Sequence, residues 1–387
     1  MKFLYIRAGQ GVDDVAITLK KMGHEVTAYA EHSFYPDGTP DEAYEKLEKL
    51  IRTGRYDFLI SYLFFGRVSD ICQENGLRYI AWVYDSPLVT LFEEAAKNEV
   101  NHIFIFDKTE YERLLSLEIP HLYYMPMAAC TSRIGAVKIL PEHEKRFSHE
   151  VSFVGDLYDD NAYDKVFPHL EKEQQALLQQ EVTASLNDWS ASKSWPKAPA
   201  WLIELCRDKK LLNEEYAHGM DPATFIAVAV ICRKQAQVER ASVLSMASAF
   251  GDTHLYTRGE PSYLDKRIHI HGQIDYYTDM TRVFNLSKIS LNITIPSIET
   301  GLPQRIWDIM GSGGFCLTNH QAEIEDFFKI GEEIETFKSL EELAAKVKYY
   351  LTHEDVRQRI LINGFEKVMN EHTYEQRLNE MIEKAGR

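Results

Sequence analysis

Apolar runs of strand length alternate with segments of helical periodicity along the first third of the chain. The runs occupy residues 2–8, 25–30, 57–63, 78–85, 102–107 and 122–127, and the helical segments lie near 12–22, 40–53, 67–75, 88–98 and 108–116. Strands that alternate with helices form parallel sheets, because each right-handed crossover lays a helix on one face of the sheet. The alternation therefore predicts an α/β fold with a doubly wound sheet.

A second alternating region begins at residue 151, after a charged stretch of little periodicity at 128–150 that we interpret as a linker. Strand-like runs lie at 254–257, 267–272, 289–295, 315–318 and 333–337, and helical segments at 339–352, 354–370 and onward to about 384 close the chain. Between 160 and 250 the pattern is helical. The sequence thus predicts an N-terminal domain at 1–148, a C-terminal domain at 149–370 with a helical insertion at about 160–250, and a last helix within 371–387.

The composition restricts the class of protein. A chain of 387 residues is long enough for two domains with separate cores. The formal net charge of −16 argues against a general nucleic-acid or anionic-membrane partner. Five cysteines without C-x-x-C spacing indicate reduced thiols in a cytoplasmic protein. No apolar run approaches the roughly 20 residues that span a bilayer, and the N-terminal MKFLYIRAGQG is interpreted as a strand and not as a signal peptide.

Residues 297–319, SIETGLPQRIWDIMGSGGFCLTN, form the most informative segment. They predict a strand–loop–helix–strand unit, and ligands in such folds bind at strand ends beside helix N-termini. Gly301 permits close approach of a ligand to the backbone, and Pro303 suits the first turn of a helix. Arg305 and Asp308 share one helix face, which suggests that Arg305 meets a diphosphate while Asp308 accepts hydrogen bonds from a ribose. The alternative is an ion pair between these two side chains.

In the N-terminal domain, carboxylates follow predicted strands at the edge of the sheet where ligands bind. Asp85 ends YIAWVYDSP, and it is either a general base for an acceptor hydroxyl or the cap of the following helix. Asp107 ends HIFIFD and is interpreted mainly as a helix cap. Asp13 and Asp14 follow the loop Gly9-Gln-Gly11, where capping is again the expected role. That loop lacks the third glycine of a dinucleotide-binding fingerprint, so no NAD site is predicted.

Loops at strand ends of the C-terminal domain supply further candidates. Gly155 in FVGDLYDD and Gly272 in HIHGQIDYY follow predicted strands, and Tyr276 either stacks on a base or sugar or belongs to the core. His269 and His271 alternate on one strand without a third ligand nearby in sequence, so no metal site is predicted. The sequence has no Walker loop, G-x-S-x-G elbow or H-E-x-x-H motif, which argues against kinase, hydrolase and metalloprotease functions.

Several of these segments are shared with a known family. They are WVYDSP (82–87), IFIFDK (103–108), YMPMA (124–128), VSFVGDLY (151–158), HGQIDYY (271–277), SKISLNIT (287–294), GLPQRIWDIMGSGGFCLTN (301–319) and EHTYEQR (371–377). Through them the chain resembles the CgeB-like (spore maturation protein B) family of GT-B glycosyltransferases, a bacterial family. The resemblance implies a GT-B fold, with two Rossmann-like domains facing a central cleft and the last helix packing back on the N-terminal domain.

The resemblance also implies roles for individual residues. The nucleotide-sugar donor is expected mainly on the C-terminal domain, and the acceptor mainly on the N-terminal domain. The diphosphate is assigned to a backbone segment assisted by Arg305, and the base to a second segment; the residues are Thr300, Gly301 and Leu302 for the first and Gly272, Gln273 and Ile274 for the second. GT-B enzymes generally need no metal, so no metal or other cofactor is expected.

One departure from the family pattern concerns the sugar. Asp308 stands where many retaining GT-B enzymes carry the ribose-binding Glu of an E-x7-E motif. Thr300 occupies the position of the first Glu, and Glu299 lies one residue away. The carboxylate that contacts the sugar, and with it a retaining outcome, therefore stays open.

The sequence thus predicts a cytoplasmic glycosyltransferase that moves a sugar from a nucleotide-sugar donor to a protein, glycan or small-molecule acceptor without a metal ion. If the enzyme inverts, Asp85 is the preferred base and Asp13 the second choice. Two other classes stay open. One is a nucleotide-sugar epimerase or hydrolase on the same fold, and the other is a non-catalytic glycan-binding protein of a surface or spore layer.

Overall fold

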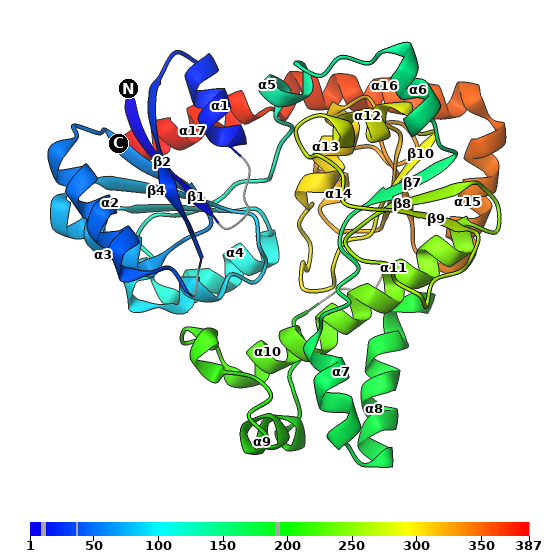
Figure 1. The fold of residues 1–387 in the computed structure, drawn as a ribbon, viewed down its shortest axis with the longest axis horizontal. Helices are drawn as coiled ribbons and strands as arrows, with labels where there is room; N and C mark the ends of the chain where they lie inside the picture. Colours follow the sequence, from blue (N-terminus) through cyan, green and yellow to red (C-terminus); the bar gives the residue numbers. More distant parts are fainter. Residues whose placement is uncertain (9–12, 36–37, 190–193, 387) are drawn as a thin grey trace. The chain divides into compact units, whose positions relative to one another are not determined.

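The computed structural model describes residues 1–8, 13–35, 38–189 and 194–386. The chain divides into two compact units (Figure 1). The N-terminal unit comprises Met1–Arg133, Asn213–Asp221 and His372–Arg387, and the C-terminal unit comprises Ile134–Leu212 and Pro222–Glu371. The boundary thus falls at 133/134, whereas the sequence placed it at 148/149. The loop Gly9-Gln-Gly11 lies outside the described residues.

The N-terminal unit contains a six-stranded parallel sheet in the order β2-β1-β3-β4-β5-β6. Its strands are β1 (Lys2–Ala8), β2 (Glu25–Phe34), β3 (Phe58–Tyr62), β4 (Arg78–Val83), β5 (Asn101–Ile105) and β6 (Leu122–Tyr124). Helices cover both faces: α1 (Asp14–Lys21), α2 (Asp41–Thr53), α3 (Gly66–Asn75), α4 (Lys108–Leu114) and α17 (Tyr374–Gly386) (Figure 1). The predicted doubly wound sheet is confirmed.

One predicted helix of this unit is wrong. Residues 88–98 form two 3-10 turns, η1 (Val89–Phe92) and η2 (Glu94–Lys97), and no α-helix. The Asn101 amide donates to the carbonyls of Ala95 (2.8 Å) and Ala96 (3.2 Å), and the Ser69 hydroxyl donates to that of Ala95 (3.0 Å). These side chains form hydrogen bonds with carbonyl groups that would accept backbone N–H hydrogen bonds if an α-helix continued here.

The C-terminal helix α17 makes its contacts within the N-terminal unit. The hydroxyl of Tyr374 bonds that of Tyr62 at 2.8 Å, and the Tyr374 ring lies 4.8 Å from the ring of Trp82. The Arg377 guanidinium donates to the carbonyl of Pro126 at 3.1 Å. The helix therefore packs against one face of the sheet, where it covers β4 and β5.

The C-terminal unit contains a second six-stranded parallel sheet in the order β12-β11-β10-β7-β8-β9. Its strands are β7 (Val151–Val154), β8 (Thr253–Tyr256), β9 (Ile268–His271), β10 (Ile289–Asn292), β11 (Cys316–Asn319) and β12 (Glu335–Phe337). One face carries α6 (Pro141–Phe147), α12 (Asp279–Leu286), α13 (Gln304–Gly311) and α16 (Glu354–Glu371), and the other carries α11 (Arg233–Ala247) and α15 (Leu340–Thr352). The four-residue helix α14 (Ile324–Phe327) lies between β11 and β12 in sequence.

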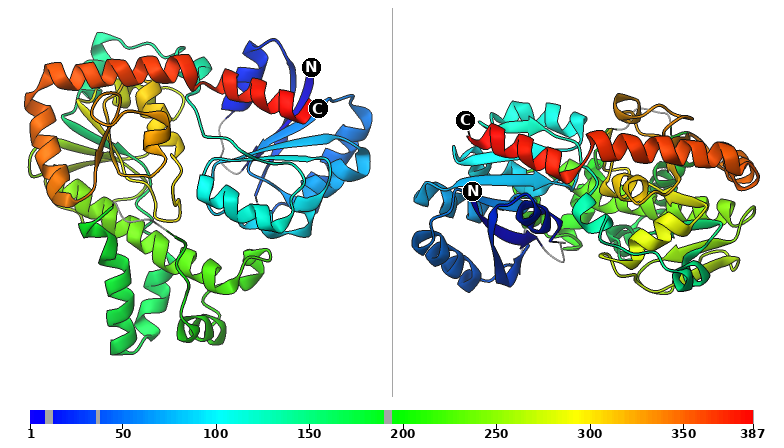
Figure 2. Two further views of the ribbon diagram at one scale, coloured as in Figure 1. Left: turned by 180° about the vertical axis from the view of Figure 1, so that it is seen from behind. Right: turned by 90° about the horizontal axis from the view of Figure 1, so that it is seen from above.

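The helical insertion has its own apolar core. It consists of α7 (Ala162–Val166), α8 (Lys172–Thr183), α9 (Ala200–Asp208), α10 (Pro222–Ala227) and the π-helical turn η7 (Val228–Cys232), which runs into α11. Val166, Leu202 and Ile226 are fully buried in this core, separately from the residues that pack against the sheet. Figure 1 and the left view of Figure 2 show α7 and α8 extending away from the sheet of this unit. The insertion is thus a small subdomain.

The predicted linker at 128–150 contains two short helices, α5 (Thr131–Ile134) and α6. Pro141 opens α6 at a position that suits proline, and Phe147 at its end is fully buried. A helix anchored by one buried ring gives too little periodicity to be recognised from the sequence. None of the described helices is long and apolar enough to cross a membrane.

Candidate functional site

A cavity of about 420 Å³ lies at the carboxyl ends of β7 and β8 in the C-terminal unit. This volume falls within the range of small-ligand sites, and the carboxyl edge of a parallel sheet is where such folds bind ligands. The lining residues are Val154, Gly155, Asp156, Tyr256, Thr257, Arg258, Gln273, Ile274, Tyr276, Met280, Gln304, Arg305 and Asp308. Six of the predicted donor-binding residues are among them: Gly155, Gln273, Ile274, Tyr276, Arg305 and Asp308.

Arg305 reaches the cavity from the first turn of α13. Its guanidinium lies 5.1 Å from the centre of the Phe153 ring and donates one long hydrogen bond, 3.4 Å, to Oδ1 of Asn292. Burial lowers the pKa of Arg305 to about 10, and the positive charge of Arg240 adds to the shift. The guanidinium is thus held in a place that disfavours its charge.

Arg240, on α11, is a second cation beside the same ring. Its Nη atoms donate to the backbone carbonyls of Asp156 and Ile293, the latter at 2.9 Å, and its buried Nε has no hydrogen-bond partner in the structure. Its guanidinium lies 5.5 Å from the Phe153 ring centre and 4.7 Å from that of Tyr158. Within the described parts of the chain, neither Arg240 nor Arg305 forms an ion pair with a carboxylate. One buried and one half-buried guanidinium, neither in an ion pair with a carboxylate among the described residues, favour an anionic ligand.

Our sequence reasoning missed Arg240. The arginine stands on the buried face of α11 together with Ala236, Val243 and Ala247. A charged residue within an apolar helix face is unusual, because such side chains are seldom fully buried without a partner. An arginine at an apolar position of this helix is the sequence pattern from which Arg240 could have been predicted as a functional residue.

Gly155 leaves the space that Arg305 occupies. It follows β7, and its N–H donates to the carbonyl of Tyr256 at 2.9 Å. A Cβ atom at this position would lie 2.5 Å from Nη2 of Arg305 and 3.2 Å from the ring of Phe153. A side chain at position 155 would therefore displace the arginine.

Asp308 lies one turn after Arg305 on α13 and is 3% exposed. Its Oδ1 accepts a hydrogen bond from the Gln304 amide at 3.2 Å. The alternative interpretation of the sequence, an Arg305–Asp308 ion pair, is not formed among the described residues. Both side chains instead line the cavity.

The segment after β9 forms another wall. Gln273, Ile274 and Tyr276 line the cavity, whereas Gly272 does not, and a Cβ atom there would meet nothing within 4 Å. The Tyr276 ring stands edge-on to that of Tyr277, with centres 5.6 Å apart. Neither tyrosine belongs to the buried core, so the core alternative for Tyr276 is wrong.

The loop before α13 contributes none of its predicted diphosphate-binding residues to the lining of this cavity. Thr300, Gly301 and Leu302 do not line the cavity. The Thr300 hydroxyl donates to Oε1 of Glu323 at 2.6 Å, so a carboxylate distant in sequence contacts the residue that replaces the first Glu of the motif. Glu299 is 2% exposed and accepts a hydrogen bond from the backbone N–H of Trp195 at 2.9 Å, which ties the insertion to this loop.

In the N-terminal unit, Asp85 is exposed at the carboxyl edge of the sheet, two residues after β4 ends. It does not cap the next helical turn, because Leu88 holds the N-cap position of η1 without a side-chain bond. Burial raises the pKa of Tyr84, and the Asp85 charge contributes to this shift. Asp107 caps α4, accepting from the N–H of Glu110 at 3.1 Å, as predicted.

The capping prediction is wrong for Asp13 and Asp14. Asp13 holds the N-cap position of α1 without a side-chain cap bond, and its Oδ1 accepts from Nε of Arg7 at 3.0 Å. Both oxygens of the buried Asp14 accept from Nε of Arg133, at 3.1 and 3.0 Å. A guanidinium forms stronger hydrogen bonds with a carboxylate than a backbone N–H does. Asp13 lines a separate cavity of about 230 Å³ within the N-terminal unit.

Comparisons with known proteins concern the fold and the C-terminal part of the chain. A family model described as glycosyl transferase-like matches residues 236–383, which contain β8 to β12 and the cavity residues from Tyr256 onward. No curated protein sequence matches the chain.

Three solved structures show the fold. HepE of Anabaena, in complex with UDP and glucose, matches with a TM-score of 0.54 and 9% identity over 99% of both chains. A glycosyltransferase of Rickettsia africae matches with a TM-score of 0.57 and 11% identity over 99% of this chain and 98% of its own. Sucrose-phosphate synthase of Thermosynechococcus elongatus matches with a TM-score of 0.55 and 10% identity over the same shares. The protein has the GT-B fold of glycosyltransferases, as predicted, and its C-terminal part is glycosyl transferase-like.

Proposed function

We propose that the protein is a glycosyltransferase whose nucleotide-sugar donor binds in the cavity of the C-terminal unit, with its diphosphate beside Arg240 and Arg305. One observation carries the proposal: the half-buried guanidinium of Arg305, which lines the cavity, and the buried guanidinium of Arg240 have no carboxylate ion-pair partner among the described residues. A diphosphate supplies the missing negative charge and accepts bidentate hydrogen bonds from arginine.

The same groups act on the reaction. When the bond between sugar and diphosphate breaks, negative charge grows on the leaving diphosphate. Arg305 and the N-terminus of α13, which has no acidic residue in its first turn, stabilise that charge in the transition state. The proposed reaction is metal-independent, because two arginines and a helix N-terminus stabilise the negative charge on the leaving diphosphate.

The remaining cavity residues suit the nucleoside. Asp308 offers a buried carboxylate to the ribose hydroxyls, and Tyr276 offers a ring on which a base stacks. The side-chain amide of Gln273 can both donate a hydrogen bond to the edge of a base and accept one from it. Because HepE was solved with UDP and glucose, UDP-glucose is the first donor to test.

The acceptor is a protein, a glycan or a small molecule. Asp85 is the proposed base for an inverting reaction, since it is exposed at the carboxyl edge of the N-terminal sheet. Asp13 is the weaker candidate, because Arg7 already neutralises it. A place in the CgeB-like family of bacteria rests on the shared motifs. A cytoplasmic location fits the five buried free cysteines.

A panel of UDP-, GDP-, CDP- and dTDP-sugars tests the proposal. We expect one nucleotide to raise the melting temperature, and mass spectrometry to detect sugar transfer once a glycan or peptide library is added. Release or epimerisation of the sugar with donor alone would instead identify a hydrolase or epimerase. Absence of any stabilisation by the whole panel contradicts the donor site and favours a non-catalytic protein.

A further inference from the structure

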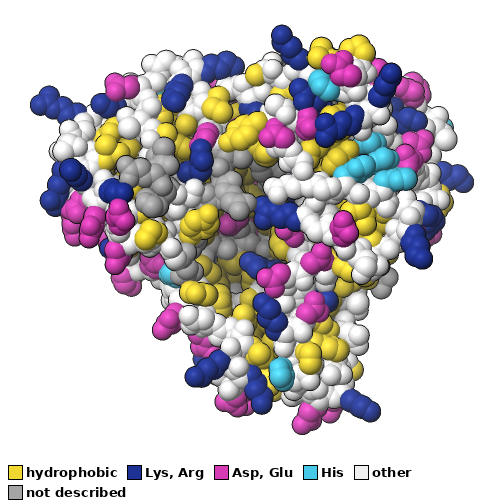
Figure 3. Space-filling view, in the orientation of Figure 1, with side chains coloured by type: hydrophobic (Ala, Val, Ile, Leu, Met, Phe, Trp, Pro, Cys, Tyr) yellow, Lys and Arg dark blue, Asp and Glu magenta, His cyan; other side chains and the backbone are white. Residues whose placement is uncertain are grey.

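A layer of imidazole rings lies at the open edge of the C-terminal sheet. His254 on β8 and His269 on the edge strand β9 are direct cross-strand neighbours. His271, two residues further along β9, and His149, just before β7, complete the layer, and the ring centres of His149 and His254 are 3.6 Å apart. Figure 3 shows histidine side chains gathered on this face of the molecule, over β8 and β9.

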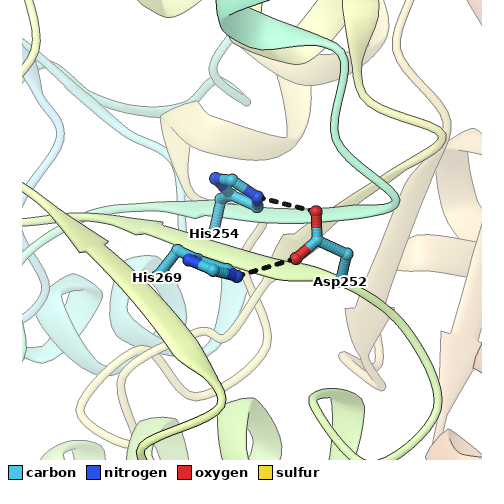
Figure 4. Close-up of side chains that lie close together, drawn as sticks. All are labelled: Asp252, His254 and His269. Carbon is cyan, nitrogen blue, oxygen red and sulfur yellow. Dashed lines mark hydrogen bonds and ion pairs between the residues drawn. The ribbon is translucent and has the colours of Figure 1, made fainter.

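Asp252 joins two of these rings. Its Oδ2 lies 2.9 Å from Nε2 of His254, and its Oδ1 lies 3.0 Å from Nε2 of His269. Figure 4 shows both ring nitrogens directed at the one carboxylate. One ligand atom from each of the three residues lies within 4.8 Å of the other two. The ligands that sequence inspection did not find near His269 are therefore two: His254 on β8 and Asp252, the residue before β8.

We propose that Asp252, His254 and His269 form a binding site for a transition-metal ion of the zinc class. Two imidazoles and one carboxylate suit Zn²⁺, Co²⁺ or Ni²⁺, whereas Ca²⁺ and Mg²⁺ prefer sites made of oxygen atoms. Three protein ligands leave the remaining coordination positions to water.

The site needs only side-chain movement to close on an ion. Metal–nitrogen distances of about 2.1 Å place tetrahedral ligand atoms about 3.4 Å apart. The side chains of His269 and Asp252 are 60% and 51% exposed, so they are free to rotate, while that of His254 is 13% exposed and held in place by its neighbours. One fixed ligand and two adjustable ones can thus adopt the geometry that an ion requires.

The surroundings of His254 support a metal on its Nε2. Its other nitrogen, Nδ1, lies 2.8 Å from Nε2 of His271. With an ion on Nε2, His254 carries its proton on Nδ1 and donates it to His271, the outer hydrogen bond that metal-bound histidines usually make. The His149 ring stacked at 3.6 Å fixes the orientation of the imidazole.

This site is separate from the proposed donor site. Asp252, His254 and His269 do not line the donor cavity. Strand β9 nevertheless leads from His269 to Gln273, which does line it. An ion that crosslinks β8 to β9 therefore anchors the edge strand from which the cavity wall continues, and its role is structural and not catalytic.

Titration of the untagged, metal-free full chain with Co²⁺ tests the inference, because visible absorption by Co²⁺ reports its ligands without any enzymatic activity. We expect one equivalent of Co²⁺ to give an absorption band of low-coordinate cobalt, which Zn²⁺ then abolishes. Zn²⁺ should also raise the melting temperature. His269→Ala and Asp252→Asn should each weaken binding at least about tenfold, and His271→Ala about 10-fold through loss of the outer hydrogen bond.

His169→Ala is the matched control, because His169 is an exposed histidine in the insertion of the same unit. It should bind Co²⁺ like the wild type. Asp252 and His269 are exposed, so their substitution leaves the fold intact. An unchanged Co²⁺ spectrum in His269→Ala, or no visible band with the wild type, overturns the proposal and leaves the three residues as a hydrogen-bonded cluster.

Discussion

Replacement of Arg305 by Met should make the unliganded protein more stable while abolishing its response to nucleotide. In the folded chain, burial and the nearby Arg240 lower the pKa of Arg305 from 12.5 to about 10. At about 1.36 kcal/mol per pKa unit, this shift corresponds to roughly 3 kcal/mol of unfavourable free energy for the charged side chain. Because Arg305 keeps some solvent exposure, screening reduces the figure.

The favourable contacts of Arg305 offset part of this cost. The cation–π contact with Phe153 contributes about 0.5–1 kcal/mol, and the 3.4 Å bond to Asn292 contributes little. The net gain in the free energy of unfolding for Arg305→Met is therefore about 1 kcal/mol. For a unit of this size, that raises the melting temperature by roughly 2–4 °C.

Thermal unfolding with and without the nucleoside diphosphate that best stabilises the wild type measures both effects. Arg267→Met is the matched control, since Arg267 is an exposed arginine of the same unit that pairs with Asp265. It should keep both the melting temperature and the nucleotide response of the wild type. The reasoning is refuted if Arg305→Met melts several degrees lower than the wild type and still gains stability from the nucleotide.

Three further predictions follow from the structure. Gly155→Val places a side chain on Nη2 of Arg305, so calorimetry should show a 10- to 100-fold loss of donor affinity with an unchanged circular dichroism spectrum; wild-type affinity contradicts it. Asp85→Asn should lower kcat about 100-fold or more at unchanged donor affinity, and a normal kcat rules out Asp85 as the base. Burial, assisted by His121 and Arg78, lowers the pKa of His102 to about 4. The unfolded chain, with a histidine pKa of about 6.5, binds the extra proton as the pH falls from 6.5 to 4, so stability is lost in that window. His102→Phe should remove roughly 2–3 kcal/mol of this loss, and identical melting temperatures of variant and wild type from pH 7 to 4 exclude the assignment.

The sequence predicts the sheets well because their strands are buried on both faces. β3 (FLISY) and β5 (NHIFI) are buried along their whole length, so each contains a short run of apolar residues between helical segments. Gly155, Gln273, Arg305 and Asp308 were also predictable, since each stands in a loop or in the first two helical turns after a strand. Ligands gather at such positions in any parallel sheet.

What the sequence could not predict depends on contacts between distant segments. From its position in the sequence, Asp14 is expected to cap its helix. Its actual partner, Arg133, is 119 residues away along the chain and cannot be found from the local sequence. In the sequence, Arg240 is one more charged residue of a helix, because its partners, the Phe153 ring on β7 and the Ile293 carbonyl just after β10, are distant along the chain. The two ligands proposed beside His269 are His254 on another strand and Asp252 just before that strand, and only the strand pairing reveals them. Local patterns contain none of these partners.

Calorimetric titration with nucleoside diphosphates and their parent nucleosides tests the central claim most directly. We predict that one diphosphate, with UDP tested first, binds the wild type with one site per chain. Its nucleoside should bind at least about 100-fold more weakly, a difference of about 2.7 kcal/mol. Arg305→Met should reduce the diphosphate to the affinity of the nucleoside. Equal affinities of diphosphate and nucleoside for the wild type, or no binding of either, would contradict a diphosphate site at Arg240 and Arg305.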